Sequence, residues 1–279
     1  MVLESLISPM RAEKRPRNLF IIGFVYALIS IFLSLWIFED QASLISVFII
    51  VISAIPLFYA TLRLEEEKDI TMIEEKNILR EHSKAILFLL FLFCGIVMAY
   101  IVAYLLLPQK NVAQLFNLQQ TTITAINASM SNFGTFTKIF LNNIKVLTFC
   151  IIFSFFYGAG AIFILTWNGS VVATAVGNFI REHVSKYAGA LGFIKIANYF
   201  QGFSLGILRY SIHGIPEIAA YFVASMAGGI LSVAITRHDF KTKKFENILL
   251  DVSNLILISV AILLVAGLLE TYVSPLILA

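Results

Sequence analysis

The chain has 279 residues, of which 59% are hydrophobic and only 13% are charged. Soluble domains carry about 25% charged residues, and a soluble monomer of this composition would expose apolar patches that such proteins avoid. The net charge of +3 comes without a basic patch interleaved with exposed aromatic residues, which argues against nucleic acid as a partner. The composition predicts an integral membrane protein whose main partner is the lipid bilayer.

The first predicted transmembrane helix is the apolar run from Leu19 to Phe38, which follows a polar, basic stretch of 18 residues. The apolar core of a signal peptide is shorter, about 7–15 residues, and ends in small residues. This run ends in Trp-Ile-Phe-Glu-Asp instead. We therefore expect an uncleaved first span.

Five later segments are also long and apolar enough to cross a bilayer, which takes about 20 residues. Lipid offers no partners for backbone polar groups, so each continuous apolar run is expected to be helical. Runs without alternation argue against a transmembrane barrel. The predicted fold class is therefore an all-α bundle of six clear transmembrane helices, the last five being 44–62, 85–107, 144–166, 215–236 and 252–271.

Lysine and arginine near the span ends predict the orientation, because cytoplasmic connections are enriched in them. The N-terminal tail carries four such residues and the connection 63–84 carries five, whereas the connection 39–43 carries none. We expect a plasma-membrane protein with a cytoplasmic N-terminus and an outer C-terminus. In the connection 63–84, alternating Glu and Lys predicts a short charged helix or a docking surface for a partner.

The outer connection 108–143 is polar but has helical spacing of apolar residues, which predicts one or two amphipathic helices on the outer surface. Within it, Asn127 begins an Asn-x-Ser triplet and is a candidate for glycosylation on that side.

Charge parity requires a seventh crossing between residues 167 and 214. The span 144–166 is expected to run inward, and the span 215–236 must also run inward because four basic residues follow it between 237 and 244, so the chain has to cross outward between them. This segment is interrupted by glycine and carries Lys195, Asn198 and Gln201. We expect a broken or re-entrant crossing that faces protein or a water-filled cavity, since lipid exposure of such residues is costly. The alternative is an excursion along the inner surface that leaves six spans.

Small residues recur every fourth position in three places, a spacing that lets helix backbones approach closely. The sequence leaves open whether these faces pack within one chain or form a homo-oligomer. The sets are Gly169, Ala173 and Gly177, then Ala220, Ala224 and Gly228, and finally Gly202 and Gly206.

The candidate functional polar residues are His213, Glu217, Asn168 and Asn143. Pro216 suits the first position of a helix, which would place Glu217 in a first turn, where the helix dipole favours a negative charge. A continuous helix through His213 and Glu217 is then not expected, although the two could share a proton or bind a cation. The asparagines, together with Asn142, are expected to cap or flank the span 144–166, and Glu270 to lie at the outer interface.

Known enzyme patterns are missing from the sequence. It has no His-Glu-x-x-His motif, no glycine-rich phosphate loop and no Gly-x-Ser-x-Gly elbow. Cys94 and Cys150 lie in apolar runs without disulfide or zinc spacing. We therefore predict no catalytic residues, no metal and no cofactor.

Four short motifs occur in order over about residues 140–236: Asn142-Asn143-Ile144-Lys145-Val146, Gly158-Ala159-Gly160, Asn168-Gly169 and His213-Gly214-Ile215-Pro216-Glu217. Together they resemble the stage II sporulation protein M family of multipass membrane proteins. The resemblance implies a membrane anchor that holds peptidoglycan-degrading enzymes in a complex, and hence a non-enzymatic scaffold with protein partners. A transporter or channel for a small polar or ionic solute is the alternative, and an intramembrane hydrolase is the second alternative.

The resemblance also suggests a division of the chain into two parts. Residues 1–84 are expected to be an N-terminal addition of two spans and a charged cytoplasmic helix. Residues 85–279 are expected to be the family-like membrane core.

Overall fold

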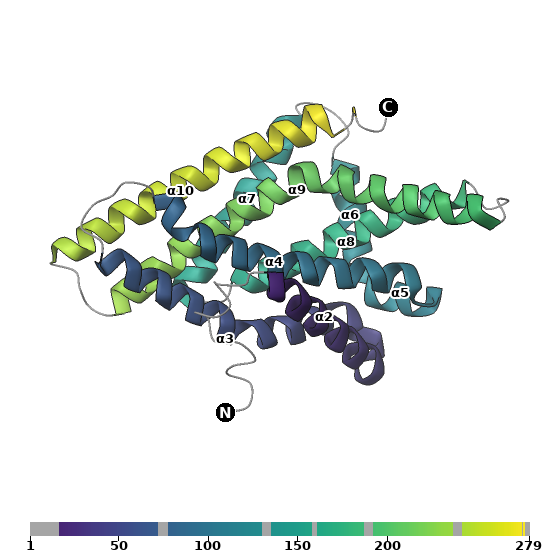
Figure 1. Ribbon diagram of the computed structural model, residues 1–279, viewed down its shortest axis with the longest axis horizontal. Coiled ribbons are helices and arrows are strands. Elements are labelled where there is room, and N and C mark those ends of the chain that lie inside the picture. The colour runs from purple at the N-terminus through teal and green to yellow at the C-terminus, as the bar shows by residue number, and fades with distance from the viewer. Residues whose placement is uncertain are drawn as a thin grey trace.

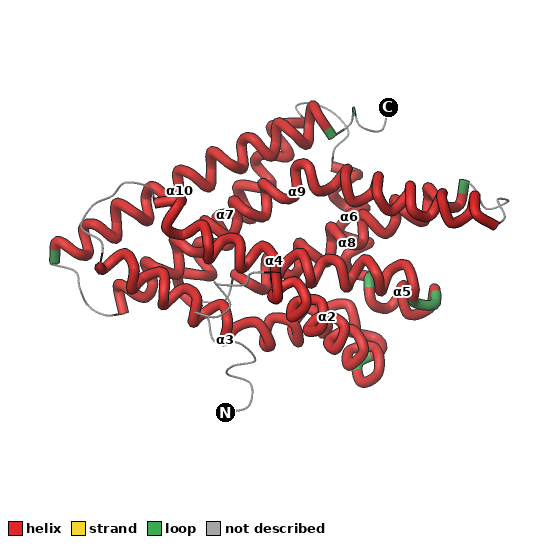
Figure 2. The backbone as a smooth tube through the Cα atoms, viewed as in Figure 1, coloured by secondary structure: helices red, strands yellow, loops and turns green. Residues whose placement is uncertain are grey.

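The computed structural model describes residues 17–71, 78–129, 135–157, 161–186, 192–236, 242–274 and 276. Every regular element in these ranges is a helix (Figure 2). Seven of the described helices are long and apolar enough to cross a membrane, which confirms the all-α membrane class. They are α2 (Arg17–Ile37), α3 (Ala42–Thr71), α4 (Ile78–Leu106), α7 (Thr135–Tyr157), α8 (Ala161–Ser185), α9 (Gly192–Thr236) and α10 (Lys243–Leu268).

The long helices run roughly along the longest axis of the molecule (Figure 1). α2 packs against α4, whereas α9 packs against both α7 and α10. α8 contacts α4 and α9 and so joins these two groups. Short helices complete the chain: η1 (Glu39–Gln41), α5 (Gln109–Leu115), α6 (Asn117–Ser129) and the π-helical turn η2 (Leu269–Val273).

Two glycines set the distance between α2 and α4. A Cβ atom added to Gly23 would lie 2.1 Å from the backbone oxygen of Leu92, and one added to Gly95 would lie 2.0 Å from that of Phe20. The two helices therefore touch backbone to backbone, as small residues permit in transmembrane helix pairs.

The three sets of small residues found in the sequence are used inside the chain. Gly169 and Gly177 pack against the rings of Phe93 and Tyr104 on α4, and Gly228 packs against the backbone of Ile151 on α7. Gly202 and Gly206 face His183 and Ile180 on α8, and Ala173, Ala220 and Ala224 are fully buried. Among the described residues, these small-residue positions pack against other helices of the same chain.

The total of seven crossings agrees with charge parity, but the helix boundaries between residues 135 and 236 differ from the expected ones. The expected span 144–166 is divided between α7 and α8, and the glycine motif 158–160 between them lies outside the described residues. The expected irregular crossing 167–214 consists of regular helix in its described part, supplied by α8 and the first half of α9. Asparagines near residues 142 and 168 lie within helices, so they do not mark helix ends.

α9 also corrects the expectation that a helix begins at Pro216. It is one helix of 45 residues with Pro216 inside it, and it therefore carries both His213 and Glu217. A proline removes one backbone hydrogen bond, which neighbouring helices help membrane proteins to tolerate. At 1.5 Å per residue the helix is about 68 Å long, well beyond the thickness of a bilayer core, and its first part projects with the end of α8 past α5 (Figure 1).

The outer connection holds two short helices, α5 and α6, and ends at residue 134 because α7 already begins at Thr135. Gln119 of α6 is fully buried. Its Oε1 accepts a hydrogen bond from Ser43 Oγ at 2.7 Å, and its Nε2 donates to Ser170 Oγ at 3.0 Å. These bonds tie α6 to both α3 and α8.

Two further expectations concern residues whose side chains are not described. Asn127 lies in α6, and most of the charged segment 63–84 belongs to the ends of α3 and α4. Nothing further follows for the glycosylation site or for a docking surface in that segment.

The α2–α4 contact gives a stability prediction. Gly95→Ala should lower the melting temperature of the purified protein, because overpacking costs about 1–3 kcal/mol, more than the roughly 1 kcal/mol that alanine gains in helix propensity. Gly214→Ala is the control, since an added Cβ there meets nothing within 4 Å, and it should leave the melting temperature equal or higher. Equal melting curves for the two variants would contradict the backbone contact.

Candidate functional site

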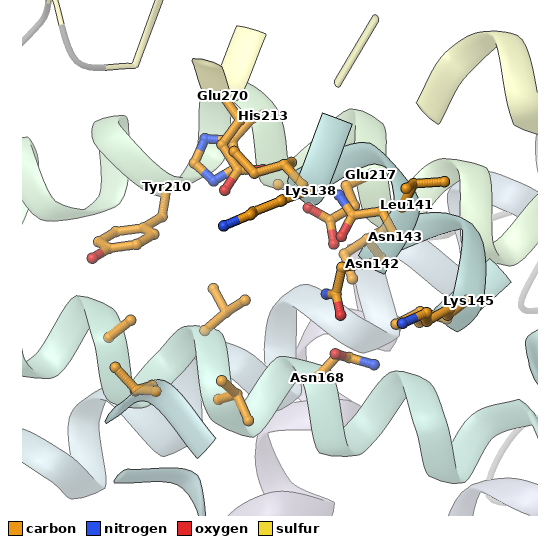
Figure 3. A pocket seen from close by; sticks show the side chains of 18 residues that line it. Lys138, Leu141, Asn142, Asn143, Lys145, Asn168, Tyr210, His213, Glu217 and Glu270 are labelled. Atoms are coloured by element: carbon orange, nitrogen blue, oxygen red, sulfur yellow. The ribbon is translucent and has the colours of Figure 1, made fainter. Parts of the chain in front are cut away.

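A cavity of about 720 Å³ lies between α7, α8 and α9. Glu270 in η2 and Ile123 in α6 complete its lining. Figure 3 shows its polar side chains, which come from helices far apart in the sequence. The cavity is described below helix by helix.

α7 contributes the largest group of polar side chains. Lys138, Asn142 and Lys145 all line the cavity, and their spacing of i, i+4 and i+7 places them on one face of the helix. Asn143 also lines the cavity and is 6% exposed. This helix therefore presents two amines and two amides along a single wall.

α9 forms the opposite wall with Tyr210, His213 and Glu217, again at i, i+3 and i+7. The unbroken helix through Pro216 is what aligns these three side chains. Gly214 lies between them and has no side chain. No heavy atom lies within 4 Å of the position that its Cβ would occupy, so the cavity is open at this point.

α8 supplies one polar residue, Asn168, and the smaller apolar residues Val171, Val172 and Ala175. Asn168 Nδ2 donates a hydrogen bond to the carbonyl oxygen of Ile164 in its own helix at 2.8 Å. One of its two N–H donors and its carbonyl oxygen can thus serve other partners.

Hydrogen bonds fix two of the ionisable side chains. Tyr221 donates its hydroxyl proton to Glu217 Oε1 at 2.9 Å, one turn further along α9. His213 Nδ1 lies 2.9 Å from Ser274 Oγ, which ties α9 to the end of the chain after η2. Both contacts hold the side chains in place and leave a second polar atom on each for a ligand.

The cavity reaches the middle of α7. Lys145 lies ten residues after Thr135 and twelve before Tyr157, so it is about 15 Å from the Thr135 end of the helix. A lysine at the centre of a transmembrane helix costs about 2.5–3.5 kcal/mol on insertion scales and faces water, protein or a ligand. Lys145 is exposed within the chain and lines the cavity, so the cavity is its polar environment.

Comparison with protein families places these residues in a known context. Residues 85–275 match the family of stage II sporulation protein M. The chain belongs to this family. No curated protein and no solved structure matches it. Every residue that lines the cavity falls within the matched range.

Three of the four motifs quoted from the sequence contribute residues to this one cavity, and the fourth, 158–160, lies outside the described residues. His213, Glu217, Asn168 and Asn143, the four candidate polar residues, all line it. The described structure therefore brings together segments that the sequence of this family member keeps up to 74 positions apart. Whether these residues act on a ligand stays a prediction.

Sequence reasoning did not select Lys138, Lys145 or Tyr210 as candidate residues, and it gave Asn142 and Glu270 roles at the span ends. The spacing of Lys138, Asn142 and Lys145 was a usable signal, because it repeats with the helical period. It was obscured by the expected start of a span at residue 144. Likewise, the division of the chain at residue 84 stays a prediction, although the family match begins at residue 85.

Proposed function

We propose that this protein binds a charged polar ligand in the cavity between α7, α8 and α9 and carries it across the membrane, as a transporter does. The observation that carries this proposal is Lys145 at the middle of α7, in a cavity that also holds Glu217. A purely structural protein has little reason to keep both charges at that depth, since each costs insertion energy.

Lys145 is too deep for the usual structural explanation of a membrane lysine. Lysines near helix ends extend their side chains to the interface and keep the charge in water. The distance from Lys145 to the outer end of α7 is about 15 Å and to the inner end about 18 Å, by helical rise. A lysine side chain covers neither distance, so the charge needs a polar site within the membrane.

The size and chemistry of the cavity are those of a ligand site. Pockets for small molecules range from about 300 to 1,000 Å³ and combine apolar walls with a few placed polar groups. This cavity, at about 720 Å³, combines valine, isoleucine and leucine side chains with the amines, amides and carboxylates described above. Transporters place their substrate sites near the bilayer midplane, which is where Lys145 lies.

The contact between His213 and Ser274 does not favour a hydrolase. A serine nucleophile needs a histidine base within hydrogen-bond reach and access to substrate. Ser274 is only 6% exposed and is not among the described residues that line the cavity. We interpret this contact as a structural one that holds the residue after η2 against α9.

A scaffold role is the second candidate function, favoured by the projecting hairpin of α8 and α9. Near its tip, Ile194 is 65% exposed and Phe200 is 73% exposed. Exposed apolar residues on a projecting element suit contact with another membrane protein. We propose a plasma-membrane location in which this hairpin lies outside and the N-terminus lies in the cytoplasm.

Flux into proteoliposomes tests the transporter proposal. In a screen of cationic, anionic and zwitterionic compounds, both water-soluble and amphiphilic, at least one should cross the membrane of vesicles that contain the protein and not that of empty vesicles. Glu217→Gln should reduce its flux about 10- to 100-fold, because a hydrogen bond to a charged group contributes about 1.5–3 kcal/mol.

Glu246→Gln is the matched control for that experiment. Glu246 is an exposed carboxylate in the first turn of α10, away from the cavity lining, and its loss should leave flux unchanged. Flux that is indifferent to Glu217→Gln and His213→Ala would contradict the site.

Photo-crosslinking in cells tests the scaffold candidate. A photoreactive amino acid at Phe200 should give adducts with a defined partner protein, whereas one at Phe32, a 65% exposed residue of α2, should give none. In a background with Cys94→Ala and Cys150→Ala, Phe200→Cys should react with a membrane-impermeant maleimide on intact cells. Adducts at neither position would count against a scaffold, and labelling only after permeabilisation would reverse the proposed orientation.

A further inference from the structure

We propose that the ligand is the headgroup of a phospholipid that carries a phosphodiester and a primary ammonium group, and that it enters the cavity sideways from the bilayer along α7. This inference rests on the proposed function of the cavity as a ligand site, and it names the ligand class and the route of entry. Three observations lead to it: the lateral rim of the cavity, the balance of its charges and the type of its hydrogen-bonding groups.

The rim of the cavity belongs to the lipid-facing surface of α7. Leu141 and Lys145 line the cavity, lie four residues apart on one helix face, and are both exposed, Leu141 by 53%. Phe149 and Ile152, one and two turns further along the same side, are exposed as well. The cavity is therefore open beside a surface that contacts acyl chains, about 9 to 15 Å from the outer end of α7 by helical rise.

An opening at this depth suits an amphiphile better than a fully soluble ligand. The headgroup of a lipid would occupy the polar interior while its acyl chains stay against Leu141 and Phe149, in the hydrocarbon. A fully soluble solute has no acyl chains to place against this apolar rim. It would therefore gain no binding free energy from the rim, because the free energy of apolar contact is proportional to the apolar area that is removed from water.

The charges that line the cavity are balanced. Two lysines, Lys138 and Lys145, accompany two carboxylates, Glu217 and Glu270, and the described lining holds no other lysine, arginine or acid. A ligand with one charge of each sign can pair with both Lys145 and Glu217, whereas a purely anionic or purely cationic ligand offers a charge to only one of these two groups.

The two ends of the cavity differ in chemistry. In Figure 3, Asn142, Lys145 and Asn168 gather at one end, His213 and Glu270 lie at the other together with Lys138, and Glu217 lies between. An ammonium and amide N–H groups are donors that suit a phosphodiester, and Asn168 has one such N–H beyond its bond to Ile164. The structure thus assigns the phosphodiester to the Lys145 end and the ligand's ammonium to the carboxylate of Glu217.

The ammonium is assigned as primary because of the residues around it. Quaternary ammonium groups are recognised by several aromatic rings arranged as a cage. Tyr210 is the one Phe, Tyr or Trp among the described residues that line the cavity. Carboxylate and amide oxygens accept hydrogen bonds, which a primary ammonium can donate and a quaternary one cannot.

Binding of a labelled lipid tests the inference. The full-length protein is reconstituted in phosphatidylcholine nanodiscs that contain a trace of phosphatidylethanolamine with a photoreactive acyl chain, and covalent labelling is measured. Labelling should saturate and should be displaced by unlabelled phosphatidylethanolamine, but not by phosphatidylglycerol or by further phosphatidylcholine. Labelled peptides should include the stretch around Leu141 and Phe149.

Lys145→Met and Glu217→Gln should each weaken this binding about tenfold or more, the effect of losing one charge-assisted hydrogen bond. Lys110→Met is the control, because Lys110 is exposed on the outer surface and pairs with Glu39 at 2.7 Å; it should bind as the parent does. Lys145→Arg keeps the charge and should retain most of the binding, which separates a role in binding from one in folding.

Each alternative outcome has a distinct meaning. Competition by soluble glycerophosphoethanolamine equal to that of the lipid would overturn lateral entry of a lipid and leave a polar solute as ligand. Equal competition by phosphatidylglycerol would overturn the zwitterionic class. Labelling that does not saturate, or that stays unchanged in both Lys145→Met and Glu217→Gln, would overturn the inference. The flux assay described above tests the proposed function independently of this result.

Discussion

The position of one charged side chain, Lys145 at the middle of α7, constrains the rest of the membrane core. Its amine cannot reach either end of the helix, so polar surroundings have to be built around it at depth. α7 itself supplies Asn142, α8 supplies Asn168, and α9 supplies Glu217. The cavity is thus a shared consequence of three helices that each turn a polar face inward.

Close packing elsewhere is what keeps those polar faces directed to the cavity. On α8, Gly169 and Gly177 hold one side of the helix against the rings of α4, so the neighbouring face with Asn168 and Ala175 is left for the cavity. On α9, Gly228 fixes the inner half of the helix against the backbone of α7. Small residues therefore position the site without forming part of its chemistry, since they determine which sides of the helices can meet.

Sequence reasoning predicted the all-α membrane class and the need for a seventh crossing, because hydropathy and the distribution of Lys and Arg report directly on burial in lipid. It placed helix ends wrongly at three positions between residues 142 and 216. Asn142 and Asn168 looked like span boundaries, and Pro216 looked like a helix start, yet all three lie inside helices. A polar residue marks the end of a transmembrane span only when lipid surrounds the helix on all sides. In this bundle, polar residues inside the spans face one another across the cavity.

The same reasoning selected His213, Glu217, Asn143 and Asn168 as candidate residues, but it did not select Lys145 and gave Glu270 a role at the outer interface. Depth was the missing information. A residue's depth follows from where its helix begins and ends, and α7 begins nine residues before the expected span. Tertiary proximity was a second gap, because the spacing of small residues marks Gly228 as a packing position but does not show that it packs against the backbone of Ile151 on α7.

The central claim is that water or a polar ligand reaches the middle of the membrane beside α7. Thiol accessibility measures this directly, in protein reconstituted in vesicles in a Cys94→Ala, Cys150→Ala background. Asn142→Cys, on the cavity wall, should react readily with a charged methanethiosulfonate reagent, whereas Leu257→Cys, a 67% exposed residue in the middle part of α10, should remain unreacted in lipid. Equal inertness of the two cysteines would show that the cavity is dry and would contradict the account.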